Sequence, residues 1–232
     1  MTDRILIVTP VDGGDVMTAR VTAGYAEHVR HVSAMYSASV LPSSLFFTTD
    51  VVRARNRAAA VALSTDGWDR LLWWDDDVLL GDYGLVGKML AIDEDMIAAP
   101  YVTKGEDPRW THTLYPLVPP VLDARGILSV RSVGFGFTMT SRKMLEKMSL
   151  DARKYRDVRR GGSPKIANIF GQLYERIVDD WNDAEDDTLM SEDYSFCKRW
   201  RKDHFGNIWI YGGPGNMNGH VGARAFDSRD MG

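Results

Sequence analysis

The stretch "LLWWDDDVLL", residues 71–80, places three consecutive aspartates directly after four large apolar residues. An apolar run that stops abruptly is typical of a strand buried on both faces of a parallel sheet. In an open sheet of this kind, ligands bind beyond the carboxyl ends of the strands, which is where Asp75, Asp76 and Asp77 would lie. The stretch therefore predicts a strand inside a sheet and an acidic site at its end.

Strands and helices alternate on either side of this stretch. "RILIVTP", residues 4–10, predicts a buried central strand, and "DMIAAPYV", residues 95–102, predicts another. Helices are predicted over 22–38, over 51–64 with Asp50 as N-cap and Gly67 as the stop, and over 84–92. Such alternation produces parallel strands with right-handed crossovers. The expected fold class is α/β, with a mainly parallel sheet flanked by helices.

Shorter elements are expected after residue 102. "DARG", residues 123–126, predicts a hairpin turn. Helices are predicted at "SRKMLEKM" with Ser141 as cap and at "SEDYSFCKRWRKD" with Ser191 as cap, followed by a strand at "GNIWIYG".

The composition is that of a compact globular protein. Of the 232 residues, 44% are hydrophobic and 26% charged, which suits one large α/β domain. The single cysteine, Cys197, excludes an internal disulfide and fits a reducing compartment. Because no stretch resembles a signal peptide or a membrane span, we expect a cytoplasmic protein, in the host cytoplasm if it is viral, without membrane insertion.

The charge is unevenly distributed along the chain. The net charge of −4 argues against a wholly basic nucleic-acid binder. Between residues 142 and 165, however, nine Lys and Arg oppose three Asp and Glu. Within this segment "DARKYRDVRRGGSPK", residues 151–165, lacks apolar periodicity and predicts a loop. Such a loop can neutralise phosphates of a nucleic acid; the alternatives are a solvated loop or a lid over a bound diphosphate.

Three adjacent carboxylates repel one another and are costly to bury, so a cation is expected to neutralise them. In an extended chain Asp75 and Asp77 would point to one side and Asp76 to the other. Mg²⁺ or Mn²⁺ binds one or two carboxylates together with phosphate oxygens, which suits a nucleoside diphosphate. The alternative is a solvated acidic turn, the usual role of a charge run.

Seven motifs carry a family resemblance over most of the chain. They are "TP" at 9–10, "RARNRAAAVAL" at 53–63, "LLWWDDDVLL" at 71–80, "MIAAPYVTK" at 96–104, "VGFGFTMTSRKML" at 133–145, "SEDYSFCKRWR" at 191–201 and "GHVGARAF" at 219–226. In this order they resemble glycosyltransferases of the GT-A fold, especially small bacterial and viral members. The resemblance implies a mixed, mainly parallel, Rossmann-like sheet. It also implies one domain over 1–232, with a nucleotide-sugar half at 1–105 and an acceptor half at 106–232 that contains the basic loop 151–165.

The resemblance also implies a donor and metal site. Asp75, Asp77 and His220 would bind Mn²⁺ or Mg²⁺, although the third acid leaves open that Asp76 contacts the metal or the ribose. The donor would be a nucleoside diphosphate sugar, with UDP the favoured nucleotide. The residues that would contact it are Thr9, Pro10, Val11, Arg53, Arg55, Asn56, Asp75, Asp76, Lys104, Gly134 and Gly136. Phe135 or Phe137 would stack on a ring, with core packing expected for at least one of the two, and Trp73 and Trp74 are expected in the core.

In the same family the second acid of an "ED" pair serves as general base. Asp193 is therefore the expected base that deprotonates the acceptor hydroxyl, with Glu192 orienting a substrate. The alternative is that both acids only stabilise the start of a helix. Whether the reaction inverts or retains configuration stays open.

The expected function is transfer of a sugar from the donor to an acceptor hydroxyl. One candidate acceptor is a hydroxymethylated base in bacteriophage-type DNA; the others are saccharides, lipid-linked molecules and proteins. Acceptor contacts are expected from Arg153, Lys154, Arg156, Arg159 and Arg160. Outside this class, a nucleotidyltransferase and a noncatalytic nucleotide-sugar-binding protein are the alternatives.

Overall fold

The computed structural model describes residues 4–10, 19–41, 50–103, 109–114, 120–156, 165–176, 187–212, 219–221 and 225–226. Four of the predicted site residues, Val11, Lys104, Arg159 and Arg160, lie outside these ranges. The backbone of His220 is described and its side chain is not.

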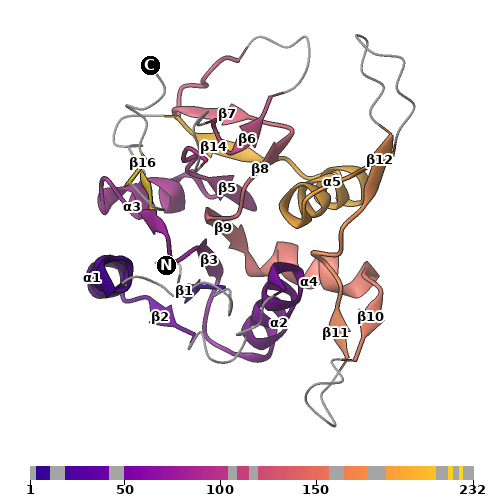
Figure 1. Cartoon of the computed structure of the whole chain (residues 1–232), viewed down its shortest axis with the longest axis horizontal. Coiled ribbons are helices and arrows are strands. Elements are labelled where there is room, and N and C mark those ends of the chain that lie inside the picture. The colour runs from indigo at the N-terminus through magenta and orange to yellow at the C-terminus, as the bar shows by residue number, and fades with distance from the viewer. Residues whose placement is uncertain are drawn as a thin grey trace.

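A seven-stranded sheet forms the centre of the molecule, in the order β2-β1-β3-β9-β5-β14-β7 (Figure 1). Its strands are β1 (Ile5–Val8), β2 (Ser39–Val40), β3 (Arg70–Trp74), β5 (Met96–Ala98), β7 (Ile127–Ser129), β9 (Phe137–Ser141) and β14 (Trp209–Tyr211). All run in one direction except β9 and β7, which are antiparallel to their neighbours. The predicted mixed, mainly parallel sheet is confirmed. The prediction of a central first strand is only partly right: β1 is internal, whereas β9 occupies the middle.

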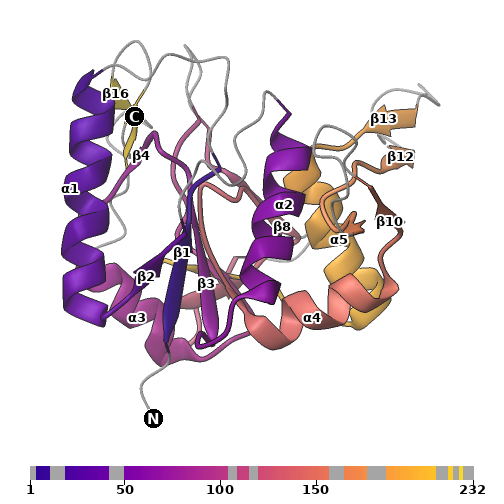
Figure 2. The same cartoon turned by 90° about the horizontal axis from the view of Figure 1, so that it is seen from below.

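Helices cover both faces of the sheet (Figure 2). On one face lie α1 (Ala19–Tyr36) and α3 (Gly84–Ile92); on the other lie α2 (Val51–Ser64), α4 (Arg142–Asp151) and α5 (Glu192–His204). Successive side chains of a strand therefore enter different cores. Trp73 packs into the core beneath α2, α4 and α5, and Trp74 packs into the one beneath α1 and α3. Burial on both sides explains why these strands read as continuous apolar runs.

The predicted helix starts are confirmed at three caps. The side chains of Asp50, Ser141 and Ser191 accept hydrogen bonds from backbone N–H groups in the first turns of α2, α4 and α5. The predicted bounds 51–64 are confirmed for α2, whereas the predicted stop at Gly67 is not, because Thr65 is the C-cap. Gly67 instead adopts a φ of 85° in the turn that leads to β3.

Four small sheets complete the described fold. They are β4 (Val78–Leu79) with β15 (Gly219–Val221) and β16 (Ala225–Phe226), β6 (His112–Thr113) with β8 (Ser132–Val133), β10 (Lys154–Tyr155) with β11 (Ile166–Ala167), and β12 (Tyr174–Arg176) with β13 (Asp187–Leu189). Among the helices of the described ranges, none combines the length and the apolar character needed to cross a bilayer.

Two loop predictions need correction. The predicted loop over 151–165 is wrong where the structure describes it. Residue 151 is the last of α4, and residues 154–155 form strand β10, which pairs with β11. Only Ile166 of this pair is buried, so its sequence lacks the alternation that predicts a strand. The turn at 123–126 does form, since Gly126 N donates to Asp123 O at 2.9 Å. It does not make the predicted hairpin, because β7 pairs with β14 across the sheet.

Candidate active site

The three aspartates form a turn at the carboxyl end of β3. The backbone N–H of Val78 donates to Asp75 O at 3.1 Å, and Trp74 Nε1 donates to Val78 O at 2.8 Å. The expectation of an extended chain with side chains on alternating sides is therefore wrong. The hydrogen bond from the buried Trp74 ring to the carbonyl of Val78 links the end of β3 to the start of β4 across this turn. Asp75, Asp76 and Asp77 are partly exposed at this edge of the sheet.

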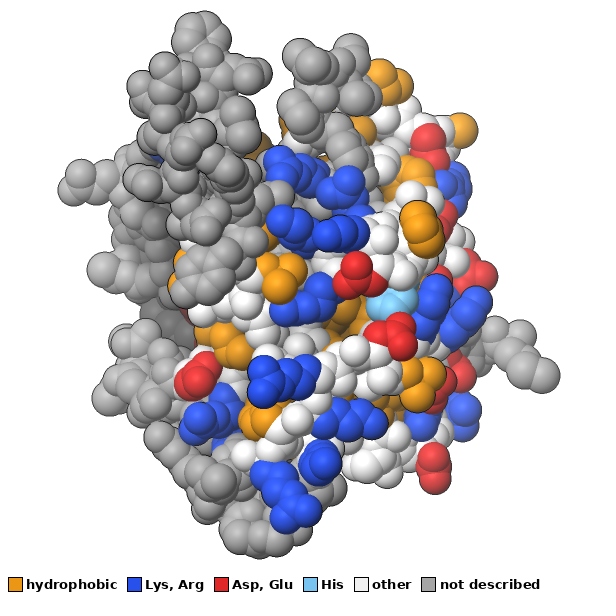
Figure 3. Space-filling model, turned by 90° about the vertical axis from the view of Figure 1, so that its right-hand side faces the viewer, with side chains coloured by type: hydrophobic (Ala, Val, Ile, Leu, Met, Phe, Trp, Pro, Cys, Tyr) orange, Lys and Arg blue, Asp and Glu red, His pale blue; other side chains and the backbone are white. Residues whose placement is uncertain are grey.

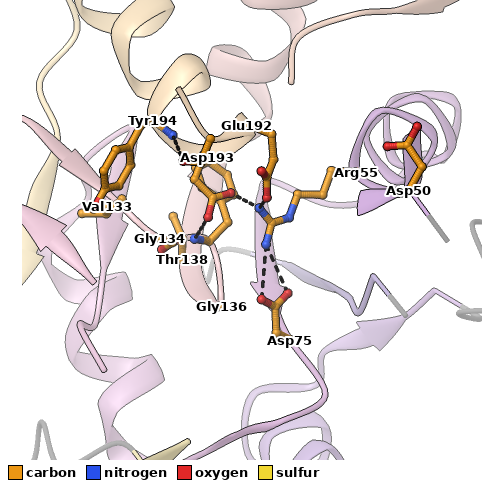
Figure 4. Close-up of polar contacts among 12 residues, drawn as sticks. Asp50, Arg55, Asp75, Val133, Gly134, Gly136, Thr138, Glu192, Asp193 and Tyr194 are labelled. Carbon is orange, nitrogen blue, oxygen red and sulfur yellow. Dashed lines mark hydrogen bonds and ion pairs between the residues drawn. The ribbon is translucent and has the colours of Figure 1, made fainter. Parts of the chain in front are cut away.

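Arg55 of α2 lies between carboxylates that come from two other elements (Figure 4). Its Nη2 is 3.2 Å from Asp75 Oδ2, its Nη1 is 2.8 Å from Glu192 Oε1, and Nη1 also contacts Asp193 Oδ1. The side chain of Arg55 is 4% exposed. We call Arg55, Asp75, Glu192 and Asp193 the carboxylate cluster.

Aromatic rings and charges both act on the Arg55 guanidinium. Its Cζ lies 5.6 Å from the ring centroid of Phe135 and 6.0 Å from that of Phe170. Burial by itself would lower the pKa of Arg55, but the carboxylates of Asp75 and Glu192 outweigh it and raise the pKa above its ordinary value. Arg55 is therefore a permanent cation.

Within the carboxylate cluster one guanidinium faces three carboxylates. The three acids are 14–25% exposed, so water screens their mutual repulsion only in part. Asp76 and Asp77 add further negative charge next to Asp75 in the chain. This edge of the sheet therefore has an electrostatic preference for cations.

The structure separates helix capping from the placement of the two acids of α5. Ser191 Oγ accepts the N–H of Tyr194 at 3.3 Å and so takes the capping role. The Glu192 and Asp193 side chains instead turn toward Arg55, and Asp193 Oδ2 accepts the N–H of Phe135 at 3.1 Å. Both carboxylates also lie at the positive end of the α5 dipole. The alternative that both acids only stabilise the helix start therefore leaves their orientation unexplained.

The glycines of "GFGF" are required by a buried tyrosine. A Cβ on Gly136 would lie 2.2 Å from Tyr101 Oη, which accepts the N–H of Gly136 at 2.9 Å. A Cβ on Gly134 would lie 3.1 Å from the same atom. The prediction that Phe135 or Phe137 stacks on a sugar is wrong, because both rings are fully buried. The group that approaches these glycines closely is thus the hydroxyl of Tyr101. Only the glycine backbone is available for a contact with the donor.

The two predicted donor residues of α2 besides Arg55 differ in their surroundings. Asn56 is 1% exposed, donates to Asn168 Oδ1 at 2.8 Å and accepts the N–H of Phe170 at 3.0 Å. The amide thus anchors residues 168–170 to α2, and a donor contact by Asn56 stays a prediction. The Arg53 side chain is 31% exposed and lies 4.0 Å from the Asp50 carboxylate.

The carboxyl end of β1 lies beside that of β3. Val8 is in register with Trp73, so Thr9 and Pro10 follow β1 at the edge where the acidic turn follows β3. Thr9 Oγ1 contacts the hydroxyl of Tyr25 from α1, and both Thr9 and Pro10 are buried. Burial, together with the charges of Asp76 and Asp75, raises the pKa of Tyr25 to about 12. These predicted donor residues are thus brought to the same edge as the aspartates.

A late strand brings residue 220 to the acidic turn. In the β4–β15 pair His220 is in register with Val78, the residue after Asp77. The backbone thus supports the predicted proximity of His220 to Asp75 and Asp77. Among the side chains that the structure describes, which exclude that of His220, no three His, Cys, Asp or Glu are grouped as metal ligands.

Comparisons with known proteins find matches among solved structures. No protein-family model and no curated protein matches the sequence. Among solved structures, the chain is similar to A197 from STIV, a viral protein, with a TM-score of 0.54 and 16% identity. The match covers 94% of this chain and 85% of that one. At this identity the likeness shows the α/β fold alone.

Sequence reasoning missed Tyr101, whose ring is buried beside the carboxylate cluster. Burial and the Asp75 charge raise its pKa far above the ordinary value, so the hydroxyl stays protonated. A tyrosine three residues after the end of the buried strand β5 was the available signal. Cys197, by contrast, was expected to have no catalytic role. Its thiol is buried, which raises its pKa to about 12, so it is a weak nucleophile.

Proposed function

We propose that the protein is a metal-dependent glycosyltransferase that moves a sugar from a nucleoside diphosphate sugar to an acceptor hydroxyl. The observation that carries the proposal is the carboxylate cluster: Asp75 at the end of β3 and the pair Glu192–Asp193 at the start of α5 converge on one buried arginine. A metal-site acid and a general base beside each other at the carboxyl edge of a sheet suit group transfer.

The acidic turn has the donor chemistry that a hard divalent cation requires. Its oxygens are carboxylates, its side chains are partly exposed, and the nearby cluster holds more negative than positive charge. Asp75 and Asp77, with His220 from β15, would hold Mn²⁺ or Mg²⁺. When bound, the cation would neutralise the diphosphate and the charge on the leaving group.

Asp193 is the proposed general base. One of its oxygens accepts the Phe135 N–H and the other contacts Arg55, which holds the carboxylate in one orientation. At 15% exposure its side chain retains access to an acceptor. The acceptor hydroxyl would pass its proton to Asp193 as the oxygen attacks the sugar, and Glu192 would orient the substrate.

The donor would lie along the edge formed by the ends of β1 and β3. Thr9 and Pro10 flank this edge beside the acidic turn, and Arg53 projects from the first turn of α2, where its guanidinium suits a phosphate. Gly134 and Gly136 would contribute backbone contacts only. UDP stays the favoured nucleotide.

A second candidate function follows from Arg55 itself. Its guanidinium already neutralises part of the charge of Asp75 and Asp193, and a purely structural ion-pair cluster has the same geometry. This supports a noncatalytic nucleotide-sugar-binding protein. A nucleotidyltransferase is the third possibility, and it would release pyrophosphate instead of a nucleoside diphosphate.

Calorimetric titration with a panel of nucleoside diphosphates, in Mn²⁺ and then in EDTA, tests the donor site. We expect one nucleotide to bind only with metal, and Asp77→Ala to abolish that binding. Asp66→Ala is the matched control, because Asp66 is an exposed aspartate that precedes β3 at its other end. No binding by the wild type, or equal loss in both variants, would refute the donor site. Detection of released nucleoside diphosphate in the presence of acceptor separates transferase from binding protein.

A further inference from the structure

Basic side chains gather on one face of the molecule, away from the helices α1 and α3. Figure 3 shows a band of Lys and Arg running from top to bottom of the side that carries α4, α5, β10 and β11. Residues 142–156, 165–167 and 192–204, which contribute to this side, contain eleven Lys and Arg against five Asp and Glu, and two of these acids, Glu192 and Asp193, contact Arg55. We call this side the basic face. It is positive in a chain whose net charge is −4.

Helix α5 contributes to the basic face through its amphipathic pattern. Phe196, Cys197, Trp200 and His204 are buried and form the stripe that packs on the sheet. The intervening positions in the second half of the helix carry Lys198, Arg199, Arg201 and Lys202, with Asp203 as the one acid. The 3.6-residue period places Lys198 and Lys202 opposite the buried stripe, and Arg199 and Arg201, both half-buried, lie on its flanks.

Contacts between elements join α5 to the basic segment found in the sequence. Lys147 Nζ of α4 lies 3.5 Å from His204 O and 5.8 Å from the ring centroid of Trp200. Arg199 Nη1 donates to Ile169 O at 3.2 Å, beside the end of β11. Two basic segments separated in the sequence by more than thirty residues thus form one surface.

We propose that the basic face binds the phosphate backbone of a nucleic acid. Its Lys and Arg come from three elements instead of one flexible tail, so they present a fixed array of cations. The guanidinium groups of Arg199 and Arg201 are oriented by hydrogen bonds to the backbone carbonyls of Ile169 and Arg131. Fixed arginine forks of this kind match phosphate oxygens at low entropic cost.

The shape of the face favours a nucleic acid over an anionic membrane. A groove of about 590 Å³ opens between α2, α4 and the β10–β11 pair; its lining is mostly apolar, and Glu146, Lys154 and Lys165 are its charged residues. The face is therefore hollowed between its cations, and a flat bilayer would contact only the raised parts. Leu150 and Phe205, 78% and 89% exposed, are the apolar groups available for insertion. Asp151 follows Leu150 and Asp203 lies two residues before Phe205, so inserting either apolar group into a bilayer would also bring a carboxylate into apolar surroundings, which is costly.

The basic face begins close to the proposed general base. Asp193 lies in the first turn of α5, and with a rise of about 1.5 Å per residue Lys198 is about 8 Å and Lys202 about 14 Å further along the axis. A polymer bound along α5 would therefore have a nucleotide within reach of Asp193. The idea that the bound nucleic acid is the acceptor rests on the proposed function. The proposal that the basic face binds a nucleic acid does not.

Fluorescence anisotropy with a labelled duplex of about 20 base pairs, titrated over a range of salt concentrations, tests the inference. We expect the double variant Lys154→Gln/Lys202→Gln to bind at least about tenfold more weakly than the wild type, and its slope of log Kd against log salt to fall by about 2. The control Arg30→Gln/Lys88→Gln removes two cations from α1 and α3, on the opposite side of the sheet, and should bind as the wild type does.

Three outcomes would overturn the inference: no binding of duplex or single-stranded DNA by the wild type at low salt, equal losses in the two double variants, or tighter binding to phosphatidylserine vesicles than to DNA. Calorimetry with nucleoside diphosphate on the same proteins keeps the two proposals apart. Retained nucleotide binding without DNA binding refutes the basic face alone. DNA binding without nucleotide binding refutes the donor site alone.

Discussion

Replacing Arg55 by glutamine tests whether the carboxylate cluster depends on this one cation. The substitution leaves Asp75, Glu192 and Asp193 facing one another at 14–25% exposure with no positive charge among the four side chains. Removing one partner of a buried ion pair costs about 3–5 kcal/mol. Partial exposure of the acids reduces this cost, so we expect a loss of about 3 kcal/mol in the free energy of unfolding near neutral pH.

Urea denaturation followed by tryptophan fluorescence measures this loss. With a slope of about 2 kcal/mol per molar urea, the midpoint should fall by about 1.5 M. The deficit should shrink in mild acid, because protonation of the three carboxylates removes their repulsion.

Arg70→Gln is the matched control for this experiment. Arg70 is also a buried arginine of the central sheet region, but its carboxylate partner is Asp93, whose side chain is 79% exposed. Its loss leaves no group of buried like charges, so the deficit should be smaller and should not shrink in acid. If Arg55→Gln costs less than about 1 kcal/mol, or no more than Arg70→Gln at any pH, the electrostatic account of the cluster is refuted.

Three further predictions follow from the same region. Asp193→Asn should lower the turnover number of sugar transfer about 10²–10⁴-fold while nucleotide binding measured by calorimetry persists; unchanged turnover would exclude Asp193 as the base. Gly136→Ala should lower stability by about 1–3 kcal/mol in thermal unfolding, because its Cβ would lie 2.2 Å from Tyr101 Oη, and Tyr101→Phe should restore part of the loss. Burial raises the pKa values of Cys197 and Tyr25 to about 12, so the folded state holds these two protons more tightly than the unfolded state does. Their contribution to stability is complete below their ordinary pKa values and is lost as the pH rises toward 12. The Cys197 thiol should accordingly react with a disulfide reagent only after unfolding, and fast reaction of the native protein would contradict its burial.

Much of the fold was predictable because local patterns carry it. The runs at residues 5–8 and 71–74 are buried on both faces, so every position had to be apolar. The caps Asp50, Ser141 and Ser191 are recognisable because each satisfies backbone N–H groups within its own turn. The α/β class follows from these local signals alone.

Sheet order was not predictable in the same way. Strand β9 comes from residues 137–141, yet it inserts between β3 and β5 and reverses the local strand direction. Pairing across such sequence distances depends on which surfaces remain unpaired once the helices have packed, and periodicity contains no information on that. The same holds for β15, which returns from residue 219 to the acidic turn.

Individual site residues divide along the same line. The sequence alone determined that carboxylates stand at the end of a buried strand and that an acidic pair begins a late helix. Both features can be recognised from the types of the residues and their spacing. Only the tertiary structure decided that Arg55 joins them, that Asn56 is an internal anchor, and that Tyr101 accounts for the glycines. A side chain's role depends on which partners reach it in space, and those partners come from elements that the chain brings together only on folding.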